Sequence, residues 1–435
     1  MLKNSSIFNI DQFYKDYLKG PKLFKNREAL QSSYIPKELP HRNSEIEQIA
    51  KITACALNGD TPPNILIYGL TGTGKTATVR YVSQKLAQYC TENKPWWVYI
   101  NCNVVSTPYR ILAHIYNSIS GEEKIPPTGL PKDVIFKNLL GLLDYKIGKS
   151  ICFLVLDEID MLISKGNRES LNEILYDLTR LNENLDFCRT ALIGISNKIN
   201  FTENLDPRVS SSLGGISVNF PTYNANQLKD ILYDRACIAF YDDVIKEGVI
   251  PLCAAFAAKE NGDARKALEL LRKAGEIAER HQHKKVTNKH VHEALNELEK
   301  DYILDFIKGM PLQTQLTLAA IYLLTKYGEN YIITSGDIYE VYAEICNKLP
   351  GIKLITKRRI SDFINELNQA GIINATIKSL GRYGRTKIIN LNIEMGLIEK
   401  VFENNQKLKT ILEYKPVLLQ KDKIKFNQNV FKKLI

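Results

Sequence analysis

The chain has 435 residues, of which 44% are hydrophobic and 24% are charged, and its formal net charge is +10. This length predicts two or three domains, and the composition argues against widespread disorder. No apolar run approaches the roughly 18 residues of a membrane span, and the first residues lack a signal-peptide core, so we expect a soluble, cytoplasmic protein with no membrane partner.

The positive charge is concentrated in the C-terminal part of the chain. Residues 301–435 contain 20 Lys and Arg against 13 Asp and Glu, whereas the first 300 residues contain 38 against 35. Within residues 351–390 the counts are 8 and 2. A local excess of this kind favours a polyanionic partner.

Cysteine and histidine spacing gives little support for a metal site. The eight cysteines are scattered without a C-x-x-C pair and are expected to be reduced, mostly in the core. Four histidines flank a Lys-rich loop, without cysteines or acidic residues at suitable spacing: His281, His283, His290 and His292. The prediction is a solvated turn, and no metal centre is assigned to them.

The predicted elements begin after a partly ordered arm, residues 1–33. In the next part, 34–221, short apolar strands alternate with segments of helical periodicity. Strands are expected at 64–69, 96–102, 151–158, 189–196 and 215–220, and helices at 76–90, 108–120, 133–145 and 169–184. The alternation predicts an α/β core with a mostly parallel sheet covered by helices on both faces.

Two further blocks follow. Residues 222–302 read as all-helical, with helices expected at 226–240, 243–260, 263–281 and 288–303. Residues 303–393 combine helices at 311–327, 335–349 and 357–370 with strands at 372–379 and 386–392. The last segment, 394–435, is rich in Lys and Asn, and its pattern assigns neither a structure nor a role.

A glycine-rich loop lies between the first strand and the helix that follows it. It matches G-x-x-x-x-G-K-[ST] and comprises Gly69, Leu70, Thr71, Gly72, Thr73, Gly74, Lys75 and Thr76. Glycines let the backbone turn tightly and aim its N–H groups at phosphate oxygens, and the helix N-terminus adds a favourable dipole. This pattern predicts that Lys75 reaches the β- and γ-phosphates of ATP and that Thr76 ligates Mg²⁺.

An acidic pair ends the third strand. ICFLVLDEID is an apolar run that ends in Asp157 and Glu158. In a phosphate-loop enzyme, an aspartate here helps to hold Mg²⁺, and the adjacent glutamate polarises the attacking water. We therefore predict Asp157 as a metal-binding residue and Glu158 as catalytic.

Together, GLTGTGKT and DEID resemble the AAA+ class of P-loop ATPases. The resemblance implies that Asn197, in ALIGISN, orients water and the γ-phosphate, and that Arg265, in GDARKALELL, reaches the nucleotide from a helical lid. Arg208, in LDPRVSSSL, resembles the arginine that acts on a neighbouring subunit's nucleotide. Each of these residues also has a structural interpretation without a catalytic role. Asn197 could be a turn residue at the end of a strand, Arg265 a solvated arginine on a helix, and Arg208 the partner of a nearby carboxylate.

Two short segments before the core complete the resemblance to a nucleotide site. Tyr34-Ile35-Pro36 and Pro40-His41-Arg42 resemble the segment that lines the adenine pocket in related proteins. The resemblance places Ile35 and Arg42 in that pocket.

One C-terminal helix combines a buried stripe with a basic first turn. Ile360, Phe363, Ile364 and Leu367 follow helical spacing, between a Thr356 N-cap and a terminal Gly371. Lys357, Arg358 and Arg359 cluster where they oppose the helix dipole. Phosphates would supply the compensating charge, because recognition helices contact DNA through their N-terminal residues.

A glycine-rich turn follows this helix, between two apolar strands. It reads GRYGRT and contains Arg382, Tyr383 and Arg385. A solvated loop is one interpretation. The preferred one is a β-hairpin wing whose arginines project toward DNA phosphates or into a minor groove, with Tyr383 against a sugar edge or bracing the hairpin.

TKRRISDFINELNQAGIINA and SLGRYGRTKIINL resemble the winged helix of the archaeal Orc1/Cdc6 initiators, and the resemblance spans about residues 34–393. It implies an AAA+ core, a helical lid and a C-terminal winged helix. It also implies binding to double-stranded origin DNA in the nucleoid, slow switch-like hydrolysis of Mg-ATP, and recruitment or loading of an MCM-type replicative helicase. The resemblance further implies that paralogous initiator subunits are partners, and that a segment within 103–145 makes a second contact with DNA.

Three rival classes of protein remain. A clamp loader should carry a Ser-Arg-Cys motif and a helical collar, and a STAND regulatory ATPase usually continues into repeat arrays; neither pattern is visible. A DNA-binding paralogue that holds ADP permanently is the third. Lys75, Thr76, Asp157 and Glu158 argue against it without excluding it.

Overall fold

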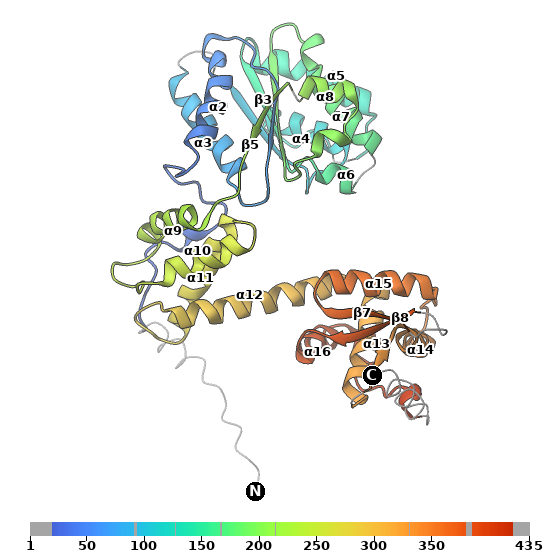
Figure 1. Ribbon diagram of the computed structural model, residues 1–435. Coiled ribbons are helices and arrows are strands. Elements are labelled where there is room, and N and C mark those ends of the chain that lie inside the picture. The colour runs from blue at the N-terminus through green and yellow to red at the C-terminus, as the bar shows by residue number, and fades with distance from the viewer. Residues whose placement is uncertain are drawn as a thin grey trace. The chain divides into compact units, whose positions relative to one another are not determined.

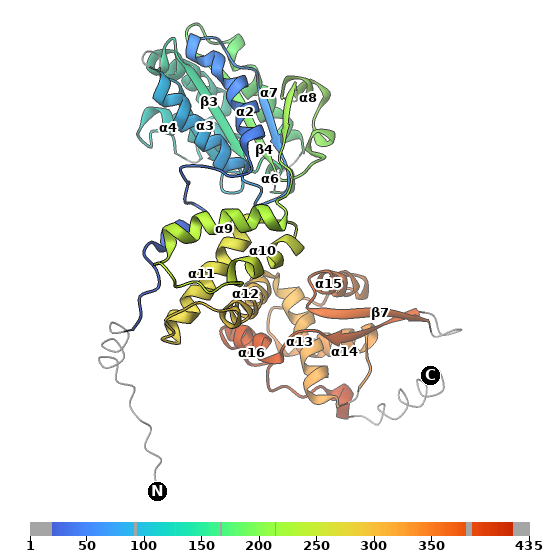
Figure 2. The same ribbon diagram turned by 60° about the vertical axis from the view of Figure 1, so that its left-hand side comes forward.

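The computed structural model describes residues 20–90, 94–126, 128–165, 168–213, 215–329, 331–379 and 385–420. The chain divides into two compact units, Met1–Ala294 and Leu295–Ile435, which are described separately (Figures 1 and 2). In the described ranges, no helix combines the length and the apolar character that crossing a membrane requires.

A five-stranded parallel sheet forms the centre of the first unit. Its order is β2-β3-β4-β1-β5, and every paired register is parallel. The expected strands are confirmed as β1 (Ile65–Tyr68), β2 (Trp96–Asn101), β3 (Ile151–Asp157), β4 (Arg189–Ser196) and β5 (Ile216–Asn219). Because the strands are parallel and β3, β4 and β1 are neighbours in the sheet, their carboxyl ends lie together at one edge.

Helices cover both faces of this sheet, which explains why β3 is apolar at successive positions. Phe153 faces a cluster that contains Ile49 and Val79, whereas Leu154 faces the opposite cluster, which contains Ile111. The two layers are visible in Figure 1. The helices are α2 (Asn43–Thr53), α3 (Lys75–Tyr89), α4 (Pro108–Ser120), α5 (Lys132–Leu142), α6 (Met161–Lys165), α7 (Arg168–Thr179) and α8 (Pro207–Leu213).

Short helical turns complete the chain path. They are η1 (Arg27–Leu30), η2 (Ala54–Asn58), the π-helical η3 (Leu143–Ile147), η4 (Leu181–Glu183) and η5 (Phe201–Asn204) in the first unit, and η7 (Val417–Gln420) in the second.

A helical lid completes the first unit. It consists of α9 (Ala225–Ala239), α10 (Val249–Lys259), α11 (Ala264–Arg280) and the start of α12 (Asn288–Gly309). The expected helix at 243–260 starts only at Val249, because Ile245 instead forms a β-bridge with Val286. The chain before the core packs on this lid: Phe24 stacks on Phe240, with ring centroids 4.5 Å apart.

The second unit has a winged-helix arrangement. It contains α13 (Leu312–Tyr327), α14 (Ser335–Lys348), α15 (Lys357–Gln369), and a sheet of order β6-β8-β7 from β6 (Ile333–Thr334), β7 (Ile373–Ser379) and β8 (Arg385–Leu391). The predicted stripe of α15 is confirmed, since its four apolar side chains are buried in the core of this unit.

The segment after residue 393, which the pattern left unassigned, contributes to the same core. It forms α16 (Met395–Glu403) and α17 (Gln406–Lys409) before η7. Ile398, Phe402 and Leu408 are fully buried there. The described part of the extension therefore stabilises the winged-helix unit by apolar burial.

Candidate nucleotide site and nucleic-acid interface

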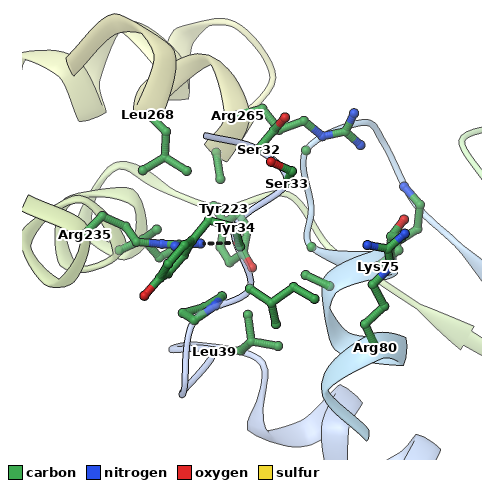
Figure 3. A pocket seen from close by; sticks show the side chains of 18 of the residues that line it. Ser32, Ser33, Tyr34, Leu39, Lys75, Arg80, Tyr223, Arg235, Arg265 and Leu268 are labelled. Atoms are coloured by element: carbon green, nitrogen blue, oxygen red, sulfur yellow. Dashed lines mark hydrogen bonds between the residues drawn. The ribbon is translucent and has the colours of Figure 1, made fainter. Parts of the chain in front are cut away.

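A cavity of about 410 Å³ opens beside the carboxyl edge of the central sheet. Its walls come from three parts of the first unit: the glycine-rich loop with the ends of β3 and β4, the segment at 32–40, and the lid helices α9 and α11 (Figure 3). Five predicted site residues line it beyond the loop itself: Ile35, Asp157, Glu158, Asn197 and Arg265.

The glycine-rich loop turns from β1 into α3. Gly74 is the N-cap of α3 and has a left-handed backbone, with φ +89°. Lys75 is buried, and its Nζ donates to the carbonyl oxygens of Gly69 (2.8 Å) and Leu70 (2.7 Å). Burial, reinforced by the positive charge of Arg265, lowers the pKa of Lys75 to about 8. The lysine is thus held against the loop that precedes it.

Oxygen donors meet where β3 ends. The Thr76 hydroxyl donates to Asp157 Oδ2 at 2.9 Å, and the Glu158 N–H donates to Asp157 Oδ1 at 3.0 Å. A hydroxyl and a carboxylate side by side form the hard oxygen set that Mg²⁺ takes, so these residues fit the predicted ion. Glu158 itself has φ +55°, an uncommon value for a residue with a side chain that often marks a functional position.

A third acid of the DEID run is used differently. Asp160 is buried, and its Oδ1 accepts the Asn197 N–H at 2.9 Å and the Ser196 hydroxyl at 3.4 Å. It therefore fixes the end of β4, where Asn197 lines the cavity. Sequence reasoning did not select Asp160, although its place in the acidic run was a usable signal.

The lid contacts the glycine-rich loop directly. Asp263 caps α11 by accepting the Arg265 N–H at 2.8 Å, and the Ala264 N–H donates to the Gly72 carbonyl at 3.2 Å. Arg265 follows in the first turn and lines the cavity (Figure 3). The two sides of the cavity are thus joined at the loop itself by the hydrogen bond from Ala264 to Gly72.

Arg42 lies in the protein interior, 2% exposed. Its Nε lies 2.9 Å from both the Thr73 carbonyl and the Tyr223 hydroxyl, and its guanidinium stacks 3.9 Å from the Tyr223 ring centroid. A bond to the Pro221 carbonyl at 2.6 Å and an ion pair with Glu45 at 3.2 Å complete the set. Among the described residues, the side chains that line the cavity do not include Arg42, which braces the loop instead.

A second arginine braces the opposite wall. Arg235 on α9 donates to the Tyr34 carbonyl at 3.1 Å and the Ala29 carbonyl at 3.2 Å, and it stacks 4.7 Å from the Tyr34 ring centroid (Figure 3). Burial lowers its pKa. Sequence reasoning missed this residue, because no local pattern pairs it with Tyr34.

Arg208 lies on α8, and its side chain is 72% exposed. Its Nε lies 3.2 Å from Asp206 Oδ1. Arg208 therefore has the nearby carboxylate partner that its structural interpretation expects. Within the described part of the chain, the cavity lining does not include Arg208.

The second unit presents the basic first turn of α15 to solvent. Thr356 caps the helix by accepting the Arg359 N–H at 3.4 Å, and Lys357, Arg358 and Arg359 are all exposed. Arg359 stacks 4.9 Å from the Phe363 ring centroid and lies 3.8 Å from Asp362. The three cations therefore form one solvent-facing cluster.

The hairpin is joined to this helix. Lys387 on β8 donates to Asn365 Oδ1 on α15 at 2.6 Å, and the Ala375 N–H of β7 donates to Asn368 Oδ1 at 2.7 Å. The paired strands confirm the expected hairpin, and Arg385 is in register with Ser379 at its outer end. Arg382 and Tyr383, as well as the Arg385 side chain, lie outside the described residues.

Comparisons with known proteins agree with this architecture. Three family models match: an AAA domain over residues 59–199, a Cdc6 AAA+ ATPase-type lid domain over 229–296, and a CDC6 C-terminal winged helix domain over 305–401. The fold and the cavity therefore define an AAA+ ATPase with a Cdc6-type lid and a winged helix.

Relatives align over nearly the whole chain. An ORC1-type DNA replication protein of Pyrococcus abyssi is 48% identical over 408 residues, which cover 93% of this chain and 96% of the relative. A Methanosarcina acetivorans ORC1-type DNA replication protein 1 is 43% identical over 95% and 98%. The Aeropyrum pernix ORC1 protein, solved in complex with DNA, is 38% identical with a TM-score of 0.78, over 90% and 99%. The chain belongs to the Orc1/Cdc6 family of DNA replication initiators.

Proposed function

We propose that this protein binds duplex DNA at a replication origin in a state set by ATP, and that it helps to recruit or load an MCM-type helicase. The observation that carries the proposal is the cavity, in which the glycine-rich loop, the acidic end of β3 and Arg265 of the lid converge. A nucleotide bound there would contact core and lid at the same time.

The polar half of the cavity suits a triphosphate. The N–H groups of residues 69–76 and Lys75 bind phosphate oxygens, and Thr76 and Asp157 hold Mg²⁺, which neutralises phosphate charge when bound. Glu158 polarises the attacking water, Asn197 orients it, and Arg265 stabilises charge on the γ-phosphate.

The apolar half suits an adenine ring. Ile35 lines the cavity together with Leu39, Ile231, Ile238 and Leu268. Arg42 lies behind the glycine-rich loop, so we assign it to positioning the loop rather than to contact with the base.

The hydrogen-bonded junction between Gly72 and the start of α11 supports a switch. A γ-phosphate would add an attraction for Arg265 that ADP lacks, so the nucleotide state would bias the lid. We therefore propose that hydrolysis is slow and regulatory.

For the second unit, we propose duplex DNA as the partner. The exposed cluster of Lys357, Arg358 and Arg359 at the start of α15 is positioned to enter or flank a major groove. The hairpin, with Arg382, Tyr383 and Arg385, would contact adjacent phosphates or the minor groove. The A. pernix ORC1 protein was solved in complex with DNA, which supports this assignment.

The remaining partners rest on family membership. We propose an MCM-type helicase as one partner and paralogous initiator subunits as others. Arg208 is exposed on α8, so it could approach the nucleotide that is bound to a neighbouring subunit. A nucleoid location follows from the proposed DNA partner.

ATP turnover by Glu158→Gln tests the ATPase part of the proposal. Loss of the group that polarises water should lower kcat by about 100-fold or more while ATP binding persists. The competing proposal is that the protein is a DNA-binding paralogue that permanently holds ADP. In that case Thr76, Asp157 and Glu158 would take no part in ATP hydrolysis. Equal turnover by wild type and Glu158→Gln would favour this alternative and contradict the proposed switch.

A further inference from the structure

Three histidines gather where the lid helix α11 ends and α12 begins. His281 is the C-cap of α11, His283 lies in the following turn, and His290 lies in the first turn of α12. One ring nitrogen of each lies within 4.8 Å of those of the other two. The spacing of these histidines in the sequence favours a solvated turn, because spacing alone does not show that the end of α11 and the start of α12 converge.

The pair at the centre of the cluster is already in contact. His283 Nδ1 lies 2.8 Å from His290 Nε2, and the two nitrogen atoms form a hydrogen bond. His290 is 3% exposed, whereas His281 and His283 are exposed. The cluster is therefore closed by protein on the side of His290 and open to solvent on the side of His281 and His283.

An acidic side chain stands beside the histidines. Glu293, one turn after His290 on α12, places Oε2 3.6 Å from His281 Nδ1. The sequence spacing predicts no acidic ligand here, but the first turns of α12 place the Glu293 carboxylate beside His281. Three imidazoles whose ligand atoms lie within 4.8 Å of one another, with this carboxylate as a fourth side chain beside His281, supply the number of ligands that a tetrahedral site needs.

We propose that His281, His283, His290 and Glu293 bind a divalent transition-metal cation of the zinc class. Imidazole nitrogens select such ions, whereas Mg²⁺ and Ca²⁺ prefer all-oxygen sets. Zn–N bonds of about 2.0–2.1 Å place tetrahedral ligands about 3.3 Å apart. The His283–His290 pair must therefore open slightly, and His281 and Glu293, each roughly half exposed, must close inward.

The surroundings of His290 fix its present tautomer, with the proton on Nε2, and metal binding must change it. The Thr287 hydroxyl lies 3.3 Å from His290 Nδ1, and the Thr287 N–H donates to the same nitrogen at 3.1 Å. When Nε2 binds the cation, the proton moves to Nδ1 and is donated to the Thr287 hydroxyl, which would orient the ring. The Thr287 N–H and His283 Nδ1 then each lose their hydrogen bond to His290, so binding exchanges these two bonds for one to the Thr287 hydroxyl and for the metal–nitrogen bonds, without net loss of a proton.

Bound metal would tie the end of α11 to the first turn of α12. Lys284 and Lys285 in the same loop oppose a cation, but both are exposed and are screened by salt. Zn²⁺ should therefore protect the amides of residues 281–290 from hydrogen exchange and raise the midpoint of thermal unfolding.

Zn²⁺ titration of the full-length protein tests the proposal. The protein should lack an affinity tag, be treated with a chelator, and be held in excess Mg²⁺ to occupy the oxygen site at Asp157. We expect one equivalent of Zn²⁺ by calorimetry, and Co²⁺ should give the strong visible absorption of a four-coordinate site. His283→Ala should weaken Zn²⁺ binding by more than about 100-fold, because residues that only orient a ligand cost about 10- to 100-fold.

His292→Ala is the matched control. His292 lies on the same turn of α12, but its ring packs edge-on against Phe256, 5.6 Å between centroids, and its loss should leave Zn²⁺ affinity unchanged. Without metal, both variants should still show a cooperative thermal unfolding transition, which excludes misfolding as the cause. No Zn²⁺ binding by the wild type, or equal affinity in His283→Ala, would overturn the proposal.

Discussion

Asp263, the cap of lid helix α11, lies directly against Gly72 of the glycine-rich loop. A Cβ atom on Gly72 would lie 1.7 Å from Asp263 Oδ1, and Gly72 has φ +70°. The lid and the loop thus approach each other so closely that only a residue without a side chain fits. The glycine-rich loop and the start of α11 are therefore in direct contact, and a displacement of one would require the other to move.

The first prediction is that Gly72→Ala separates the lid from the loop. The substitution should destabilise the fold by about 1–2 kcal/mol through its left-handed backbone and should also weaken ATP binding, because Asp263 must move. Thermal unfolding and ATP titration measure the two effects.

Gly59→Ala is the control for backbone strain. Gly59 has φ +84° with nothing within 4 Å of its added Cβ, so this variant should lose similar stability and keep its ATP affinity. Equal ATP affinity in the two variants would show that the contact with Asp263 does not matter for nucleotide binding.

The second prediction concerns pH and Lys75, whose pKa in the free protein is about 8. Below that pH the lysine is already charged, and above it the proton must be taken up when anionic phosphates bind, because they raise the pKa again. ATP affinity should therefore fall by up to about tenfold per pH unit above about pH 8. Titrations at pH 7 to 10 measure this slope.

Lys75→Arg provides the comparison, because a guanidinium keeps its charge throughout that range. Its ATP affinity should be lower but nearly independent of pH. A wild-type affinity that stays constant between pH 8 and pH 10 would contradict the proposed phosphate contact.

The third prediction tests Arg208 in trans. If it completes a neighbour's site, Arg208→Ala and Glu158→Gln should each have low ATP turnover alone on DNA. Mixing them should restore part of the activity, because the Glu158→Gln copy supplies an arginine to the intact site of the other. Turnover by the mixture no higher than that of its components would return Arg208 to its role as the partner of Asp206.

The fourth prediction separates base contact from phosphate contact. Arg359→Ala should reduce the preference for the origin sequence, whereas Arg385→Ala should weaken all duplexes alike and lower the salt dependence of binding by about one phosphate contact. Binding measured on specific and random duplexes at several salt concentrations distinguishes the two. Lys400→Ala, which removes an exposed charge from the solvent side of α16, should change neither quantity.

Much of the fold was predictable because the relevant signals are local. An apolar run that ends in Asp157 and Glu158 can be satisfied only as a buried strand with its polar end at the sheet edge. The stripe on α15 and the spacing of the glycine-rich loop are also encoded within a few turns of chain. Such segments have one favourable structure almost regardless of their surroundings.

Side-chain roles that depend on contacts between distant segments were not predictable in this way. The sequence resemblance associated Arg42 with adenine, but packing places it behind the loop, bonded to Thr73 and Tyr223. The apolar positions after residue 393 had too irregular a spacing to reveal that they complete the core of the second unit.

The sequence by itself therefore determined the order of the strands and helices, the phosphate-binding loop and the basic start of α15, because hydrogen bonding and apolar burial are satisfied there within short segments. Only the tertiary structure brought Asp263 against Gly72, Arg235 against Tyr34, and His281 beside Glu293. Each of these contacts depends on how separate elements of the chain pack together, and no local periodicity records that packing.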